Sequence, residues 1–170
     1  PIYVAYTDGS TVRKAPAAAR TYSPSETGLS ASFTQYVSTM PRLTPNTLYT
    51  YYPVVNGEQI SAASRFRTAG PGPFRFAVVG DTGMGTPGQY RVAAQLALET
   101  PAFLLHLGDI AYGHGFFSEF QKNHFDVYQE MMMRVPFFTA VGNHEYDSGD
   151  RDAAPYRALH TMPVETVPSV

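Results

Sequence analysis

The sequence predicts two units of different fold class, an all-β unit over residues 1–69 and an α/β unit of β-α-β-α-β order over residues 74–170. Three observations predict this division. The first 69 residues are short alternating segments broken by turn residues. Gly70-Pro71-Gly72-Pro73 then interrupts the chain, which is typical of a linker, here placed at 70–73. After it, apolar runs alternate with segments of helical spacing, as in parallel strands joined by crossover helices.

The first unit carries two hairpin signals. The strand-like run from Ile2 to Ala5 leads to Asp8-Gly9, and the run from Tyr49 to Val55 leads to Asn56-Gly57. These dipeptides tolerate the positive φ of a tight hairpin turn. Between and after them, "ASFTQYVSTM", "LYTYYPVV" and "SRFRTAG" carry aromatic and β-branched residues at strand-like spacing. An all-β unit is therefore predicted.

The second unit contains three nearly continuous apolar runs, "PFRFAVVG", "AFLLHLG" and "VPFFTAVG", which predict strands buried on both faces. Between the first two, a stripe of helical spacing begins after Pro87 and stops before Pro101; its members are Val92, Ala93, Leu96 and Ala97. Between the second and third, a longer apolar stripe predicts a helix that covers the sheet; its members are Phe117, Phe120, His124, Val127, Tyr128 and Met131.

Composition excludes several classes of partner and site. With 44 % hydrophobic residues in 170, the chain has enough apolar material for a core. The net charge of −2 and the lack of a Lys/Arg run predict no nucleic-acid partner and no basic membrane-surface patch. No apolar stretch reaches the roughly 18 residues of a membrane span, so no membrane partner is predicted. Because there is no cysteine, any metal must be held by oxygen and nitrogen donors.

Polar residues follow each of the three predicted strands. The first strand ends in "GDTG" with Asp81, the second in "GDIAY" with Asp109 and Tyr112, and the third in "GNHE" with Asn143, His144 and Glu145. The carboxyl ends of parallel strands meet in one crevice, so these groups are expected to converge. Two carboxylates in such a crevice would repel each other unless a cation held both ionised. The pattern therefore predicts a site for a multivalent cation.

Each element also has an ordinary structural reading. Asp81 before a helix is compatible with a helix N-cap, Tyr112 with an aromatic packed under the following helix, and Asn143-His144-Glu145 with a polar loop. Turn chemistry alone would rarely give three such strand ends in order. "GDTGMGT" lacks the lysine of a nucleotide-binding P-loop, so that reading is discarded.

Two family resemblances extend this reading. "LTPNTLYTYYPVV" followed by "FRT" resembles the end of a fibronectin type III β-sandwich, although roughly seven strands in about 100 residues would be needed, so the sandwich is expected to be incomplete over 1–69. The series G-D-x-G, G-D-x-x-Y, G-N-H-E resembles the first three of five metal-binding blocks of the purple acid phosphatases, a branch of the calcineurin-like metallophosphoesterases. Most of the superfamily has D-x-H in the first block; this chain has Gly83 there and Tyr112 in the second block, as the purple branch does.

This resemblance implies an acid phosphatase that hydrolyses phosphate monoesters with a dinuclear centre and a metal-bound hydroxide as nucleophile. Asp81, Asp109 and Tyr112 would bind Fe(III), and Asp109 would bridge to a divalent ion, Fe, Zn or Mn, which Asn143 also binds. His144 would be the catalytic residue that contacts phosphate and protonates the leaving alcohol, with Glu145 holding its neighbours in orientation. A hard ferric ion prefers carboxylate and phenolate oxygens, which fits this donor set, although spacing alone does not name iron.

The fourth and fifth blocks of the family, which would supply three histidines, have no match after Glu145. His106 lies in an apolar strand and His124 on an apolar helix face, and these, with the loop residue His114, are expected to be structural, while His160 is not expected to be a ligand. The chain is therefore expected to be an N-terminal part, with the missing half of the catalytic domain following in the same chain or supplied by a partner segment.

Two other functions stay open at this point. One is a non-catalytic binding module with a relic phosphatase half, and the other is a phosphodiesterase or nucleotidase of the same superfamily. The family resemblance and the fused β-unit also predict a secreted or periplasmic protein.

Overall fold

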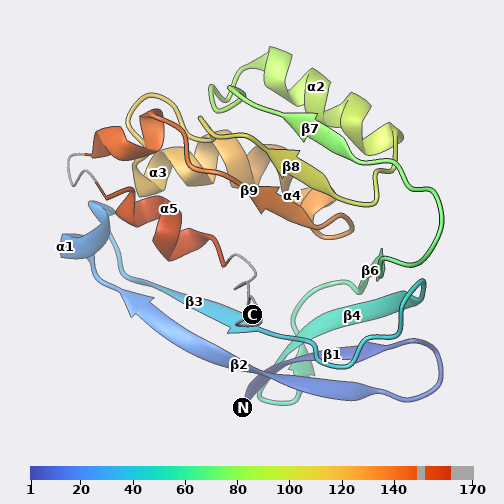
Figure 1. Cartoon of the computed structure of the whole chain (residues 1–170). Coiled ribbons are helices and arrows are strands. Elements are labelled where there is room, and N and C mark those ends of the chain that lie inside the picture. Colours follow the sequence, from blue (N-terminus) through green and yellow to red (C-terminus); the bar gives the residue numbers. More distant parts are fainter. Residues whose placement is uncertain (149–151, 162–170) are drawn as a thin grey trace, which may run out of the picture.

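The computed structural model describes residues 1–148 and 152–161, and the chain forms two units joined by segment 68–76, which contains no helix or strand (Figure 1). The first unit holds six strands and one short helix: β1 (Ile2–Thr7), β2 (Arg13–Tyr22), α1 (Pro24–Thr27), β3 (Phe33–Ser38), β4 (Leu48–Val55), β5 (Glu58–Gln59) and β6 (Ser64–Arg67). The strands follow the order β3-β2-β1-β4-β5, with β6 paired to β4, and all pairs are antiparallel. The prediction of a β-sheet unit is confirmed, and the short helix α1 is an addition to it.

Both predicted hairpins are present. β1 and β2 pair across the turn that contains Asp8-Gly9, and β4 pairs with β5 across Asn56-Gly57. Asn56 and Gly57 have φ of 51° and 93°, the positive values that this short turn requires. The long strand β2 pairs with β1 in its first half and with β3 in its second half, and so links two parts of the sheet.

Aromatic residues form the core of the first unit. Tyr49 is completely buried, and its ring lies 6.2 Å from that of Tyr6 and 5.8 Å from that of Phe66, centroid to centroid. The Tyr49 hydroxyl accepts a hydrogen bond from the backbone N–H of Thr44 at 2.9 Å. The buried hydroxyl is thus satisfied, as a buried tyrosine requires.

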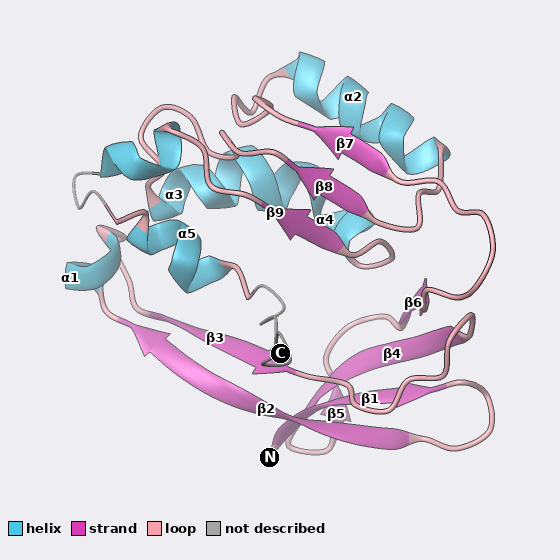
Figure 2. Cartoon of the chain, viewed as in Figure 1, coloured by secondary structure: helices cyan, strands magenta, loops and turns pink. Residues whose placement is uncertain are grey.

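The second unit has the predicted β-α-β-α-β order. Its elements are β7 (Ala77–Val79), α2 (Pro87–Leu98), β8 (Leu104–His106), α3 (Phe117–Phe120), the π-helix η1 (Gln121–Phe125), α4 (Asp126–Met132), β9 (Phe137–Thr139), the 3-10 helix η2 (His144–Ser148) and α5 (Ala154–Leu159). The three strands are parallel in the order β7-β8-β9 (Figure 2). Thr86 caps α2 by accepting from the N–H of Gln89 at 3.3 Å, so Asp81 is not the N-cap of this helix.

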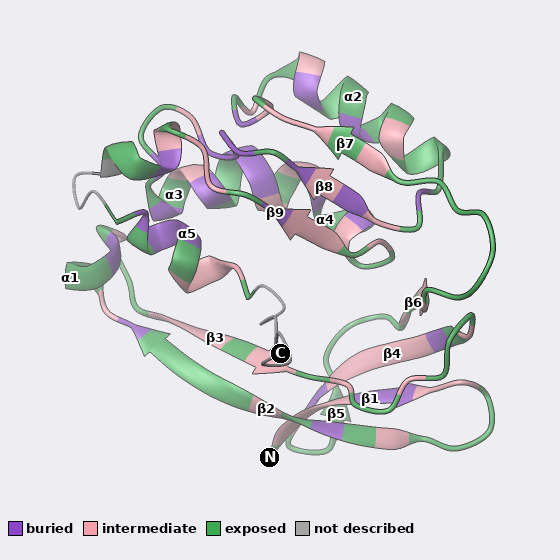
Figure 3. Ribbon diagram, in the orientation of Figure 1, coloured by how far each residue is buried: buried purple, intermediate pink, exposed green. Residues whose placement is uncertain are grey.

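Helices cover one face of the small sheet. Crossovers in one direction along the sheet are right-handed, which places both helical segments on the same side, and Figure 1 shows α2 and α4 there. Register places Val78, Leu105 and Phe138 on the opposite face, where Val78 is 48 % exposed. The prediction of strands buried on both faces is therefore wrong for Val78 in β7, whereas Leu105 and Phe138 on the same face are half-buried (Figure 3).

The predicted helical stripes are only partly buried. In α2, Ala93 is buried and Leu96 half-buried, but Val92 and Ala97 are exposed, because this helix covers only the edge strand of a three-stranded sheet. The longer stripe along α3, η1 and α4 is confirmed, with all but one of its six members buried and the remaining Val127 half-buried.

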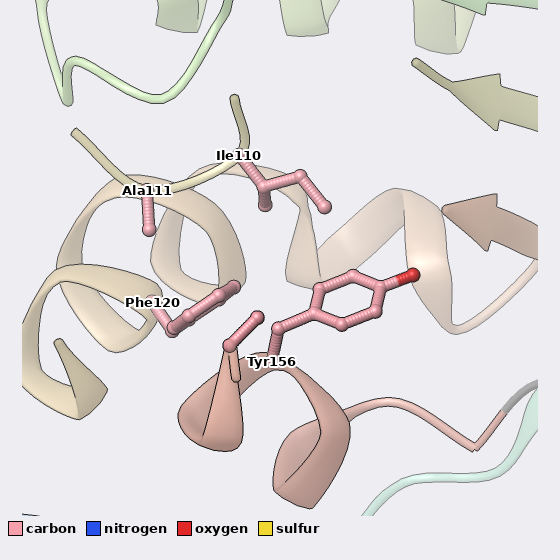
Figure 4. Packing of buried hydrophobic residues seen from close by; sticks show 5 residues of the cluster. Ile110, Ala111, Phe120 and Tyr156 are labelled. Atoms are coloured by element: carbon pink, nitrogen blue, oxygen red, sulfur yellow. The ribbon is translucent and has the colours of Figure 1, made fainter. Parts of the chain in front are cut away.

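A hydrophobic cluster supports the loop that follows β8. It contains Ile110, Ala111, Phe120 and Tyr156, the first three of them completely buried (Figure 4). The Tyr156 hydroxyl donates to the carbonyl oxygen of Thr139 in β9 at 2.7 Å. Ile110 and Ala111 directly follow Asp109, so this packing fixes the backbone between the predicted metal-binding residues of that loop.

The two units contact each other through α3, α5 and the end of α4. The Tyr22 hydroxyl donates to the Ala158 carbonyl oxygen at 3.1 Å, and the Phe117 ring lies 5.8 Å from the Tyr22 ring, centroid to centroid. On the other side, the Tyr51 hydroxyl donates to the Met133 carbonyl oxygen at 2.9 Å. Within the described ranges, no helix has the length and apolar character needed to cross a membrane.

Candidate metal centre

Backbone hydrogen bonds join the loops that follow β7 and β8. The N–H of Asp81 donates to the Gly108 carbonyl at 3.2 Å, and the N–H of Gly83 donates to the Asp109 carbonyl at 3.2 Å. In return, the N–H of Tyr112 donates to the Gly83 carbonyl at 2.8 Å. The predicted convergence of the first two strand ends is therefore present in the structure.

The Tyr112 hydroxyl lies between two carboxylates. It is 3.2 Å from Oδ1 of Asp81 and 3.2 Å from Oδ2 of Asp109. Burial and the two neighbouring carboxylates raise the pKa of the Tyr112 hydroxyl, so without a cation it is a neutral phenol whose one proton can be donated to either carboxylate. Tyr112 does not pack under the following helix, and its phenol belongs to the polar site.

Both aspartates have an unusual backbone conformation. Asp81 and Asp109 each have φ of 54°, in the left-handed region that residues with a Cβ rarely adopt. Aspartate tolerates this region better than most residues. Such conformations concentrate at functional sites, where the surrounding structure holds them. The same sharp turn at both strand ends aims the two carboxylates at the same place.

Gly83 allows the two loops to approach closely. A Cβ at this position would overlap the carbonyl oxygen of Ile110, which is backbone and cannot move aside. The first-block histidine of D-x-H sites therefore has no room in this chain, and the phenol of Tyr112 is a side-chain oxygen donor that reaches both carboxylates.

Gly83→Ala is expected to lower the free energy of unfolding by more than about 2 kcal/mol, because the two loops must separate to admit the methyl group. Urea unfolding measures this loss. Gly88→Ala in α2 is the matched control: its Cβ would meet only ordinary contacts, and alanine favours a helix, so stability should stay equal or rise by up to about 1 kcal/mol. Equal stability of both variants and the wild type would contradict the close approach.

The third loop reaches the same site through Asp109. The N–H of His144 donates to Oδ1 of Asp109 at 3.1 Å, and a Cβ on Gly142 would overlap the same carboxylate. Asn143 lies between Gly142 and His144 along the chain and is exposed. The structure thus brings the backbone of Asn143 beside Asp109.

Glu145 joins the second and third loops. It is completely buried and accepts four backbone hydrogen bonds, from the N–H groups of Asp109 (2.9 Å), Ile110 (2.8 Å), Ala111 (3.1 Å) and Gly142 (2.7 Å). A buried carboxylate without a cationic partner needs this many donors. Glu145 therefore holds the loop that carries Asp109 and Tyr112 against the loop that carries Asn143 and His144.

The His144 ring lies beside the phenol. Its centroid is 4.2 Å from that of Tyr112, and Nδ1 is 2.8 Å from the Gly113 carbonyl oxygen. A carbonyl can only accept, so Nδ1 carries a hydrogen and donates it. Nε2 is therefore the nitrogen that can gain and release a proton, which suits a general acid.

The donors at this site fit a hard cation. The phenol oxygen lies within hydrogen-bond distance of both carboxylates, and Asp81 is exposed while Asp109 is 9 % exposed. Oxygen donors of this kind suit hard, highly charged ions. Over residues 1–148 and 152–161, no three histidine or carboxylate side chains form a ready metal cluster, so the set depends on the phenol.

Among the described residues, none of the other histidines forms a hydrogen bond with the Asp81, Asp109 or Tyr112 side chain. His106 and His124 are 1 % and 0 % exposed, and His106 Nε2 is 2.8 Å from the hydroxyl of Thr82, in hydrogen-bond contact. His160 lies at the end of α5 with Nδ1 3.1 Å from the Tyr156 carbonyl oxygen. His114 is exposed and packs on Phe116.

Two residues behind the site were missed by sequence reasoning. Gln89 and Asn123 are buried amides that link the loops after β7 and β8. A signal existed for Asn123: it is a polar residue beside His124 in the middle of an apolar helical stripe, a position at which a buried polar group must have hydrogen-bond partners.

The family model of the calcineurin-like phosphoesterases matches residues 74–168, more than half of the chain. The chain therefore belongs to the calcineurin-like phosphoesterase family. Membership indicates a hydrolase domain for metal-dependent cleavage of phosphoesters, in a family whose members typically bind divalent metals. A search of curated proteins finds no match to this chain.

Proposed function

We propose that this protein is a phosphate-monoester hydrolase of the purple acid phosphatase type. The single observation that supports this choice within the family is the position of the Tyr112 hydroxyl, 3.2 Å from a carboxylate oxygen of both Asp81 and Asp109. A phenol between two carboxylates offers the hard oxygen donors that a ferric ion prefers. The lack of room for any side chain at Gly83 supports the same assignment.

Asp81, Asp109 and Tyr112 would hold Fe(III), and Asp109 with Asn143 would hold a divalent ion, Fe, Zn or Mn. The two ions, when bound, supply positive charge that neutralises phosphate oxygens and activates water. Glu145 keeps the loops that carry these ligands at a fixed separation. A dinuclear centre also requires nitrogen or oxygen ligands beyond these four, supplied by a segment outside the described residues.

His144 would act on the leaving group. Because Nδ1 donates to the Gly113 carbonyl, the ring is held with Nε2 free to carry the second proton of the imidazolium form. In that form, Nε2 can contact a phosphate oxygen and pass its proton to the departing alcohol oxygen. The ring contact with Tyr112 keeps this nitrogen next to the metal-binding residues.

The β-unit would be a fibronectin type III-like module that docks on the catalytic unit and has no catalytic role. Its contacts with α3, α5 and α4 through Tyr22 and Tyr51 support a docking role. A secreted or periplasmic location is part of the same proposal.

Tyr112→Phe tests the proposal in the protein expressed as it is naturally encoded. The wild type is expected to show a visible absorption band from phenolate bound to iron, and Tyr112→Phe to lose it while keeping its fold. Tyr146→Phe, which removes the hydroxyl of an exposed tyrosine in η2, is the control and should keep the band.

Asp109→Asn is expected to lower kcat/KM for a phosphate monoester by at least about 100-fold, because it removes a carboxylate that both ions would share. A wild type without the visible absorption band would contradict the proposal. Unchanged monoester hydrolysis by both Tyr112→Phe and Asp109→Asn would also contradict it. Faster turnover of a diester than of a monoester would instead favour a diesterase of the same family.

A further inference from the structure

A chain of three amide hydrogen bonds runs behind the metal centre. The N–H of Gly85 donates to Oε1 of Gln89 at 2.6 Å, and Nε2 of Gln89 donates to the backbone carbonyl of Asn123 at 2.7 Å. Nδ2 of Asn123 then donates to the backbone carbonyl of Tyr112 at 2.7 Å. The chain begins in the loop after β7, crosses α2 and η1, and ends in the loop after β8.

The partners fix how each amide is oriented. Gln89 faces an N–H at one end and a carbonyl at the other, so its oxygen must meet Gly85 and its nitrogen must meet Asn123. The Asn123 amide meets the Tyr112 carbonyl, which can only accept, so its nitrogen must point there. Both side chains are nearly buried, at 6 % and 7 % exposed, so water cannot readily replace these bonds.

The local backbone is arranged to admit Asn123. The helix that runs from α3 to α4 widens to a π-helix over Gln121–Phe125, and the adjacent Asn123 and His124 are both buried. Single π turns inside helices are frequent at functional sites. On the opposite side, a Cβ on Gly85 would lie 2.5 Å from Oδ1 of Asn123, so only glycine permits this approach.

We propose that Asn123, held in place by Gln89, is a positioning residue for Tyr112. Both backbone polar groups of Tyr112 are anchored: its N–H donates to the Gly83 carbonyl at 2.8 Å, and its carbonyl accepts from Asn123. These two bonds fix the Cα of Tyr112 and therefore the direction in which the phenol leaves the backbone. The metal-binding consequence rests on the proposed function, whereas the positioning of the loop does not.

Asn123 contacts neither the carboxylates nor the phenol oxygen, and it acts only through the backbone of Tyr112. Groups that hydrogen-bond to metal-binding residues orient those residues, and loss of such a group typically weakens metal binding by about 10–100-fold. The same bond also sets the distance between the loops after β7 and β8, because Gly85 lies at the other end of the amide chain.

The test compares Asn123→Leu with Gln121→Leu. Leucine has nearly the shape of asparagine but cannot donate. Gln121 lies two residues earlier in η1, is exposed, and donates from Nε2 to Asp126 Oδ1 at 2.6 Å, so it is a matched control. In metal-free protein, hydrogen exchange at the Tyr112 and Gly85 amides is compared with exchange at the Leu104 amide of β8.

Asn123→Leu is expected to speed exchange at Tyr112 by at least about tenfold relative to Leu104, because the backbone of Tyr112 loses the support of the Asn123 amide. Exchange at Gly85 should change less, because its acceptor Gln89 still donates to the backbone carbonyl of residue 123. Gln121→Leu should change none of the three. Equal acceleration at all three amides would show a purely structural role and overturn the inference, as would unchanged exchange at Tyr112.

With iron added, Asn123→Leu is expected to bind about 10–100-fold more weakly and to shift the phenolate absorption band, while Gln121→Leu keeps both properties. If the wild type binds no iron, the proposed function fails, and the exchange comparison still decides the positioning role. If Asn123→Leu does not fold, Gln89→Glu takes its place: it keeps the acceptor for Gly85, removes the donor to Asn123, and should speed exchange at Tyr112 in the same way.

Discussion

Glu145→Ala is expected to be among the most damaging single substitutions in the α/β unit, with a loss of about 3–5 kcal/mol in the free energy of unfolding. The change leaves four backbone N–H groups without an acceptor in a region from which water is excluded. Each buried, unsatisfied donor costs about 1–3 kcal/mol, and the four losses do not add fully. Such a loss is comparable with the whole stability of many domains, so the variant is expected to be largely unfolded or to lose its tertiary structure around the site.

Glu119→Ala is the matched control for this prediction. Glu119 also accepts several backbone hydrogen bonds, from the N–H groups of Gly113, His114 and Phe116, but at the surface. Water can replace the carboxylate there, so the loss should stay near 1 kcal/mol. Urea unfolding of both variants measures the difference. Similar losses in the two would mean that burial of the Glu145 contacts does not matter.

Glu145→Gln separates the charge from the shape of this side chain. The amide oxygen can still accept, but the NH₂ group faces backbone donors that it cannot satisfy. Its stability is expected to lie between that of the wild type and that of Glu145→Ala. A fully stable Glu145→Gln would show that fewer than four of the backbone bonds contribute.

The order of strands and helices around the site could be predicted because its signals are local. Apolar runs ending in Gly-Asp or Gly-Asn are visible in the sequence, and parallel strands necessarily bring their carboxyl ends together. The meeting of Asp81, Asp109 and Tyr112 follows from that topology alone. The hairpins at Asp8-Gly9 and Asn56-Gly57 could also be predicted, because two residues are enough to indicate the turn.

What could not be predicted depends on contacts between distant residues. Gln89 meets the backbone of Asn123, 34 residues away, and no periodicity marks such a pair. The shared φ of 54° at Asp81 and Asp109 is imposed by the tertiary structure rather than by residue type. The pattern of the apolar run does not by itself indicate that Val78 is exposed, because such a run gives the same signal whether one face or both are covered.

Three neighbouring histidines, two of them buried and His160 half-buried, form a second cluster beside the sheet and make the fold sensitive to acid. The ring of His124 lies 5.8 Å from that of His106 and 5.5 Å from that of His160, centroid to centroid. Both ring nitrogens of His124, Nδ1 of His106 and Nε2 of His160 have no hydrogen-bond partner among the described residues. A protonated imidazole would therefore be buried without an acceptor for its charge.

Burial lowers the pKa of all three histidines. Burial and the neighbouring His160 together lower the pKa of His106 to about 4, against the opposing effect of Asp81 and Asp109. The pKa of His124 falls well below its usual value through burial and through His160 and His106, and burial also lowers the pKa of His160.

The direction of the pH effect follows from these shifts. Above pH 6.5 both the folded and the unfolded chain hold neutral imidazoles, so the cluster does not affect stability. As the pH falls from about 6.5 toward 4, the unfolded chain binds protons that the folded chain excludes, and the free energy of unfolding decreases. His106 alone accounts for about 2 kcal/mol at pH 5.

Carboxylates act in a lower pH window. Hydrogen bonds to Ser10 and Ser23 lower the pKa values of Asp8 and Glu26 below 3.8 and 4.5. Their contribution is present above these values and is lost only as the pH falls through the folded pKa. A loss of stability that begins near pH 6.5 is therefore assigned to the histidines.

His124→Phe is expected to flatten the decrease in stability between pH 7.5 and pH 4.5 and to leave stability at pH 7.5 nearly unchanged, because phenylalanine fills the same apolar space without a titrating group. His114→Phe alters an exposed histidine and should keep the wild-type pH dependence. Urea unfolding at pH 7.5, 5.5 and 4.5 measures the free energy of unfolding of the wild type and both variants.

If the proposed acid phosphatase activity is present, the loss of activity at acidic pH should coincide with unfolding of the wild type. In His124→Phe this loss should occur at lower pH. An unchanged decline of stability in His124→Phe would contradict a role for the cluster.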